Sequence, residues 1–163
     1  MGAITNYELF VGVILTEKMI KGYIETELRR YEFSYAAQSG YLTLTAGLGG
    51  RRWKMAISCG ENRITCYSAY PWRIPGERRA TVLERLNEFN AACGLGSYFL
   101  LDAEQGGLAA FRCDIPVTDI YSISECFEEG LRRMSAAFYA RWGALLNASR
   151  NTHSSQEERE CLV

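Results

Sequence analysis

The segment PWRIPGERRATVLERLNEFN, residues 71–90, begins as a connection and continues as a helix that divides the strand-like parts of the chain into two groups. Pro75 suits the start of a helix, Glu77 would lie in its first turn, and Gly94 suits its end. Apolar side chains follow at helical spacing, namely Val82, Leu83, Leu86, Phe89 and Cys93. The pattern predicts a helix over about 77–92.

The same segment carries four arginines beside an aromatic side chain, and these residue types are typical of a nucleic-acid-binding site. The arginines are Arg73, Arg78, Arg79 and Arg85. Glutamates interleave with them at spacings that allow local ion pairs, and the chain has 18 Lys and Arg against 19 Asp and Glu. This balance offers no basic excess for phosphates. We therefore expect no nucleic-acid partner, and keep only Trp72 and Arg73 as contact candidates here.

Three segments before the helix alternate apolar and polar residues with a period of two, as strands with one buried face do. They are residues 41–46, 52–59 and 63–69. The glycines of AGLGG, residues 46–50, lack the Lys-Ser/Thr of a phosphate loop, so a hairpin turn is the better interpretation. A second turn at residues 60–62 completes a three-stranded antiparallel meander.

The six cysteines contain no Cys-x-x-Cys pair and no Cys/His cluster, so we predict no metal site. A two- or three-residue loop at 60–62 pairs residues whose numbers sum to 123 or 122, whereas Cys59 and Cys66 sum to 125. We expect no disulfide between these two. Free buried thiols are typical of a reducing compartment, and no run of 18 apolar residues is present. The expectation is a cytoplasmic protein without a membrane partner.

The remaining elements follow from the same periodicities. A helix is predicted over 16–29, a β-hairpin over 97–102 and 107–115, and a long final helix from Ser122 or Ser124. The apolar stripe of this last helix is Phe127, Leu131, Met134, Phe138, Trp142 and Leu145. The order of helix, meander, helix, hairpin and long helix predicts an α+β fold with an antiparallel sheet and helices on one face. Residues 16–147 would form a single domain, after an unassigned segment 1–15 and before a polar tail 148–163.

Catalytic residues are not evident. The single histidine, His153, lies in the polar tail and leaves no positioned base for a nucleophile. The carboxylates are explained by solvated helix surfaces and turns. We therefore expect no enzyme activity, no catalytic residue and no cofactor.

A set of residues resembles the YbjN-domain proteins, which share the type III secretion chaperone-like fold. It comprises Pro75, Glu77 and Arg78 at the helix start, Leu86-Asn87-x-Phe89-Asn90 near its end, Leu95-Gly96-Ser97-Tyr98-x-Leu100-x-Asp102, Gly106 or Gly107, and Phe111-Arg112 leading to Ile115. The resemblance covers roughly residues 41–147. It implies a chaperone-like or regulatory domain without an assigned catalytic residue, and it allows a homodimer.

The expected function is therefore a non-catalytic, chaperone-like or regulatory domain that binds a segment of another protein. Candidate contact residues are Tyr41, Tyr67 and Tyr70, which we expect on an exposed face, together with Trp72 and Arg73. The alternative is a small-molecule sensor or small enzyme that uses a pocket between the sheet and the helices. For Asn87 and Asn90, hydrogen bonds that tie the helix end to the strand entered at Ser97 explain more than a ligand contact does.

Overall fold

The computed structural model describes residues 15–102 and 106–150, and predictions for residues 1–14, 103–105 and 151–163 lie outside this range. The elements are α1 (Glu17–Arg30), β1 (Tyr35–Gln38), β2 (Tyr41–Leu48), β3 (Arg51–Gly60), β4 (Arg63–Ala69), a 3-10 turn (Gly76–Arg78), α2 (Arg79–Ala91), β5 (Gly96–Leu101), β6 (Leu108–Pro116), α3 (Ile123–Ala140) and α4 (Trp142–Ser149). The α+β class and the antiparallel sheet are confirmed.

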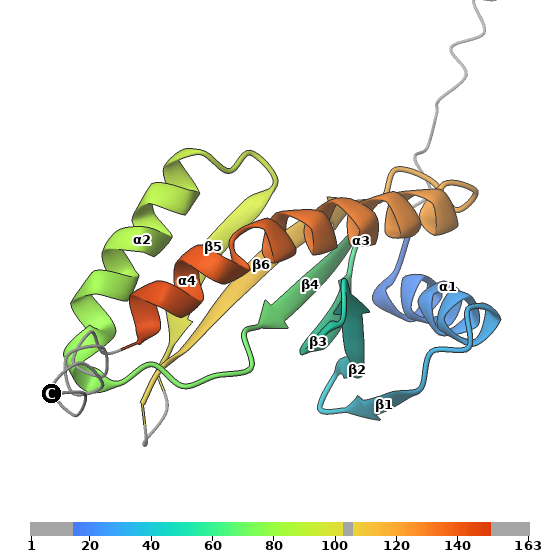
Figure 1. The fold of residues 1–163 in the computed structure, drawn as a ribbon. Coiled ribbons are helices and arrows are strands. Elements are labelled where there is room, and N and C mark those ends of the chain that lie inside the picture. The colour runs from blue at the N-terminus through green and yellow to red at the C-terminus, as the bar shows by residue number, and fades with distance from the viewer. Residues whose placement is uncertain (1–14, 103–105, 151–163) are drawn as a thin grey trace, which may run out of the picture.

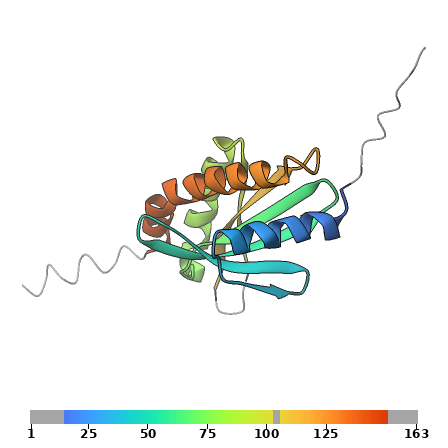
Figure 2. The ribbon, with the colours of Figure 1, turned by 90° about the vertical axis from the view of Figure 1, so that its right-hand side faces the viewer.

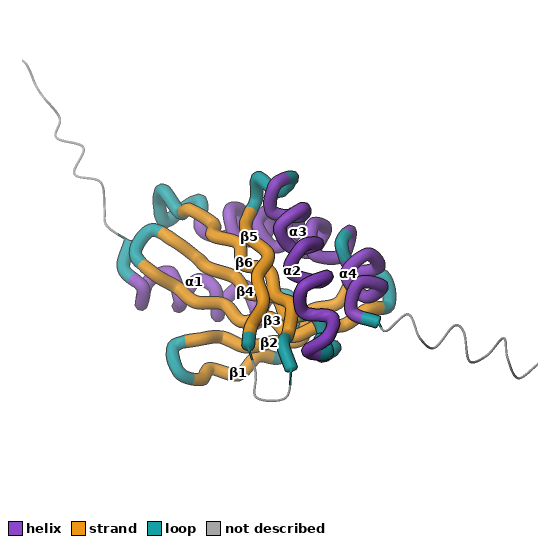
Figure 3. Tube along the Cα trace, turned by 90° about the vertical axis from the view of Figure 1, so that its left-hand side faces the viewer, coloured by secondary structure: helices purple, strands orange, loops and turns teal. Residues whose placement is uncertain are grey.

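One six-stranded sheet has the order β1-β2-β3-β4-β6-β5, and every neighbouring pair is antiparallel. The order can be followed in Figure 3. β6 enters between β4 and β5, so the predicted hairpin joins the meander through its second strand. The turn after β3 has two residues, and Cys59 pairs with Ile64, which gives the predicted sum of 123. All five cysteines of the described residues are free thiols.

The helices pack on one face of this sheet, which we call the covered face. Its strand residues include Trp53, Ile57, Ile64, Cys66 and Phe111, all buried. α3 and α4 run across the sheet, with α2 beside α4 and α1 at the other end (Figure 1). Figure 2 shows α1 along the sheet next to α3. The Ser124 hydroxyl in α3 donates to Glu27 of α1 at 2.9 Å, and Tyr31 donates to Glu128 at 3.1 Å.

Three details differ from the sequence predictions. A fourth strand, β1, extends the meander, because Tyr35–Gln38 pairs along Tyr41–Leu44 despite having no apolar alternation. The long final helix is interrupted at Arg141, so that Trp142 begins a separate α4. α4 also continues to Ser149, two residues beyond the predicted end of the domain, because Ala148 and Ser149 are buried.

The segment that separates the strand groups is a connection followed by a helix, as predicted. Its arginines serve contacts within the chain. The Arg78 guanidinium donates through Nε to the Ala148 carbonyl at 2.9 Å, Arg79 pairs with Asp102, and Arg85 pairs with Glu88 at 2.6 Å. These contacts join the start of α2 to the end of α4 and to Asp102, the residue that follows β5.

Candidate functional site

The sheet face opposite the helices, called the open face below, follows from strand alternation. Residues on this face pair across strands in rows, such as Thr43, Ala56, Tyr67, Arg112 and Ser97. Each lies between two positions of its strand that point to the covered face. No buried aromatic cluster fills these rows. They combine alanines, hydroxyl-bearing residues and a few large side chains.

A cavity of about 910 Å³ lies on the open face. Three alanines occupy neighbouring positions in its lining, Ala56, Ala69 and Ala110, and their small size leaves the space that larger side chains would fill. Aromatic and aliphatic side chains surround these alanines, and β1, β2 and the turn between them contribute hydroxyl-bearing side chains. The remaining lining residues are Ser34, Tyr35, Ala36, Gln38, Ser39, Tyr41, Thr43, Leu44, Thr45, Lys54, Met55, Tyr67, Ser68, Phe99 and Leu101.

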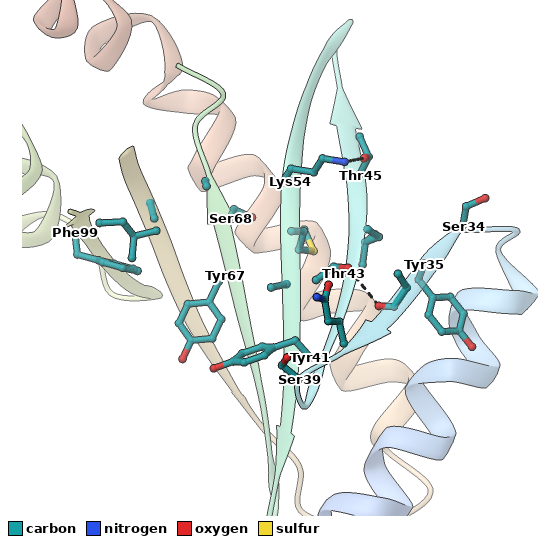
Figure 4. Close-up of a pocket in the computed structure, with 18 residues that line it drawn as sticks. Ser34, Tyr35, Ser39, Tyr41, Thr43, Thr45, Lys54, Tyr67, Ser68 and Phe99 are labelled. Carbon is teal, nitrogen blue, oxygen red and sulfur yellow. Dashed lines mark hydrogen bonds between the residues drawn. The ribbon is translucent and has the colours of Figure 1, made fainter. Parts of the chain in front are cut away.

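Figure 4 shows Tyr41 and Tyr67 close together, Phe99 on one side of them, and Lys54 reaching toward Thr45. The two tyrosine rings meet edge to face with centroids 6.2 Å apart. The Lys54 ammonium donates to the Thr45 hydroxyl at 3.1 Å. Lys54 is the one charged side chain among the described residues that line the cavity.

A small polar network next to the cavity holds Tyr67 in place. Arg112 lies over the Tyr67 ring at 5.9 Å from its centroid and pairs with Asp114 at 2.9 Å. Thr65 donates to the same carboxylate at 2.5 Å. Although partial burial raises the pKa of Asp114, the hydrogen bonds from Thr65 and Arg112 and the charge of Arg112 hold it below its usual value. The Arg112 charge is thereby largely neutralised within the protein.

Two of the predicted contact residues, Tyr41 and Tyr67, line this cavity. The prediction that Tyr70 lies on an exposed face is wrong. Tyr70 is 1% exposed and donates to the Phe138 carbonyl at 3.0 Å. Every second residue of β4 faces the helices, namely Ile64, Cys66 and Ser68, and Tyr70 continues this alternation.

Trp72 and Arg73 lie apart from the cavity, on the connection after β4. Trp72 is half-buried, donates through Nε1 to the Ser149 hydroxyl at 3.0 Å, and packs against Tyr70 and Trp142. Its indole therefore stabilises the α4 end. Arg73 is exposed. The structure does not join these residues with Tyr41 and Tyr67 into one surface.

The hypothesis that Asn87 and Asn90 tie the helix end to the strand entered at Ser97 is confirmed for Asn90 but not for Asn87. Asn90 binds the Tyr98 backbone twice, donating to its carbonyl at 2.8 Å and accepting from its N–H at 2.6 Å. This pair joins α2 to β5 as expected. Asn87 is exposed. Its side chain faces away from the sheet, because it is offset from the buried Leu86 and Phe89 on the helix.

Sequence reasoning missed Lys54, Phe99 and the three alanines as site residues. Lys54 and Ala69 were on the polar side of predicted strands, so alternation alone could have selected them. Ala110 and Phe99 could not be placed beside them, because the pairing of β4 with β6 is a long-range feature. The predicted alternative pocket lay between sheet and helices, whereas the large cavity lies on the opposite face. A second cavity, of about 100 Å³, lies near Ile74, Arg79 and Asp102.

Within residues 15–102 and 106–150, no group of three or more His, Cys, Asp or Glu side chains is placed to hold a metal ion. None of the helices in these ranges is long and apolar enough to cross a membrane.

The fold and cavity define an α+β domain with helices on one face of an antiparallel sheet and a ligand-sized cavity on the other. Its fold is similar to that of YbjN from E. coli, a candidate transcription regulator, whose crystal structure aligns with a TM-score of 0.56 at 12% identity. The alignment covers 74% of this chain and 90% of YbjN. No family model and no curated protein sequence matches the chain. The fold is YbjN-like, and at this identity the likeness concerns the fold alone.

Proposed function

We propose that the chain is a YbjN-type domain with a non-catalytic, regulatory or chaperone-like role, which binds a segment of a partner protein on its open face. The observation that carries the proposal is the 910 Å³ cavity at the helix-free side of the sheet. A cavity of this size on the open face of the sheet accommodates several side chains of an extended segment of another protein. The location in the cytoplasm stays a prediction.

The composition of the lining supports binding rather than chemistry. Among the described residues that line the cavity there is no His, Cys, Asp or Glu. Lys54 and the tyrosines are the lining groups that could act in general acid–base catalysis, and the described lining places no carboxylate or imidazole beside them. Hydroxyls, alanines and aromatic rings instead suit recognition by shape, with a few polar contacts that fix orientation.

Site-specific photo-crosslinking tests the proposal. A benzophenone amino acid replaces Tyr67 at the cavity, and the same replacement at Tyr121, which is 94% exposed on another surface, is the matched control. In cells that express the native chain, we expect the Tyr67 position to crosslink to one defined protein after irradiation, and Tyr121 not to do so. Mass spectrometry of the product then distinguishes a different protein from a second copy of this chain.

Crosslinks of equal pattern from both positions would contradict a specific open-face site. A specific site would also be contradicted if the variant with benzophenone at position 67 is folded and abundant but gives no crosslinked product.

A further inference from the structure

One row of cross-strand partners runs through the cavity and differs in chemistry from end to end. Lys54 of β3 pairs with Ala69 of β4, Ala69 pairs with Ala110 of β6, and Ala110 pairs with Phe99 of β5. A cation therefore lies at one end and an aromatic ring at the other, with two alanines between. Neighbouring strands are about 4.8 Å apart, so three steps place Lys54 and Phe99 roughly 14 Å apart.

The charge at one end selects an anion. Lys54 is the one charge among the described lining residues, and its bond to Thr45 uses one of three ammonium donors. Arg52 and Arg63 project from the same face, and Arg112 is paired with Asp114. A carboxylate on Lys54 gains a charge-assisted hydrogen bond, while a cationic group would meet repulsion.

The middle of the row selects apolar groups of moderate size. Ala110 is buried although it belongs to the open face, because the surrounding side chains rise above it. Ala69 beside it is half-buried. A ligand side chain that enters here reaches a small apolar floor, and the Phe99 ring forms the far wall.

A polynucleotide fits this row less well than a peptide. Single-stranded nucleic acids present a phosphate with every nucleotide and bind grooves with several cations. Lys54 is the one cation among the described residues that line the cavity, and Arg52 and Arg63 lie on the same face outside the lining. Asp114 adds a carboxylate to this face, and the chain as a whole carries a net charge of −1. In an extended peptide, residues i and i+4 lie on the same side and are roughly 13 Å apart, close to the span of the row.

These observations point to one occupant. We propose that the cavity binds an extended peptide that crosses the strands, with an Asp or Glu on Lys54 and an apolar side chain against Phe99 four residues away. The residue between them on the same side covers Ala69 and Ala110. This inference rests on the proposed function and names the chemistry of the partner segment at the same site.

Peptide selection tests it. A phage-displayed library of random nine-residue peptides is selected on the immobilised full-length protein, on Lys54→Glu, and on Arg85→Glu. Arg85 is an exposed arginine of α2 that does not line the cavity, so its reversal is the matched control. Wild type and Arg85→Glu are expected to enrich Asp or Glu four positions from an apolar residue, several-fold over the unselected library. Lys54→Glu is expected to lose that preference and to enrich Lys or Arg instead.

The outcomes separate the two proposals. Peptides that are enriched without an acidic preference, or with one that Lys54→Glu retains, would overturn the inference and leave peptide binding standing. A wild type that enriches no peptide would overturn both. A fluorescein-labelled dT20 oligonucleotide that binds wild type at low salt and is lost with Lys54→Gln would overturn the peptide assignment in favour of nucleic acid. Circular dichroism of every variant confirms that it is folded.

Discussion

The two faces of the sheet are built from the same strands, yet they follow different rules. On the covered face, Trp53, Tyr70, Phe138 and Trp142 form one aromatic cluster, in which Tyr70 stacks on Phe138 with centroids 3.9 Å apart. The Trp53 indole donates to the Ser68 hydroxyl at 3.1 Å, and the Tyr70 hydroxyl donates to the Phe138 carbonyl at 3.0 Å. The open face has alanines at comparable central positions. The buried aromatic packing therefore lies on one face, and the cavity lies on the other.

Trp53 and Lys54 make the comparison testable at adjacent positions of β3, because their side chains point to opposite faces. Trp53→Ala removes a 2% exposed ring that packs against Phe138 and leaves Ser68 without its donor. We expect the free energy of unfolding to fall by about 3–5 kcal/mol. Urea denaturation followed by far-ultraviolet circular dichroism measures it. A loss under about 1 kcal/mol would show that the covered face does not carry the stability.

The junction between α2 and β5 should give the next largest effect. Asn90→Ala leaves the backbone N–H and carbonyl of the buried Tyr98 without their side-chain partner. Each such group costs roughly 1–3 kcal/mol, so we expect a loss of about 3 kcal/mol. The matched control is Asn87→Ala, one turn earlier and exposed, for which the change should stay within about 0.5 kcal/mol. Equal effects in the same urea titrations would mean that the Asn90 bonds contribute little.

Alkaline pH should weaken the covered face through its thiols. Burial raises the pKa of Cys59 from 9.0 to about 11, with smaller contributions from nearby charges. The neutral thiol is favoured in the folded state, so its stabilising contribution is complete below pH 9 and is lost as pH rises from 9 to 11. The loss attributable to Cys59 is on the order of 2 kcal/mol.

Comparison with Cys59→Ala isolates this effect from other groups that titrate. Unfolding free energies at pH 8 and pH 10.5 are measured for both proteins under reducing conditions. The fall with pH should be smaller in the variant. If both fall equally, ionisation of Cys59 does not contribute.

The covered face could largely be predicted from the sequence, because burial imposes a period on each element. Trp53, Met55 and Ile57 mark β3 in this way, and Val82, Leu86 and Phe89 mark α2. Periodicity did not predict β1, because this strand is mostly exposed and burial imposes no pattern on it. It also did not predict the break at Arg141 between α3 and α4, because the apolar stripe continues across the break from Phe138 to Trp142.

The open-face site was less predictable for a related reason. Alternation assigns Tyr41, Lys54 and Tyr67 to one face but does not bring them together with residues from distant strands. The row from Lys54 to Phe99 exists because β6 pairs with β4, a contact between segments about 40 residues apart along the chain. No local pattern encodes that contact. The site therefore became visible only when the sheet order was known.

Lys54→Gln should have the smallest effect on stability of the changes considered. Lys54 is exposed, and its contact with Thr45 is a surface hydrogen bond, so we expect a change within about 0.5 kcal/mol in the urea titration. Its contrast with Trp53→Ala, one residue away, then amounts to several kcal/mol. A loss comparable to that of Trp53→Ala would mean that the open face takes part in holding the fold together. Lys54 would then be a structural residue, and its place among alanines and hydroxyls would need no partner to explain it.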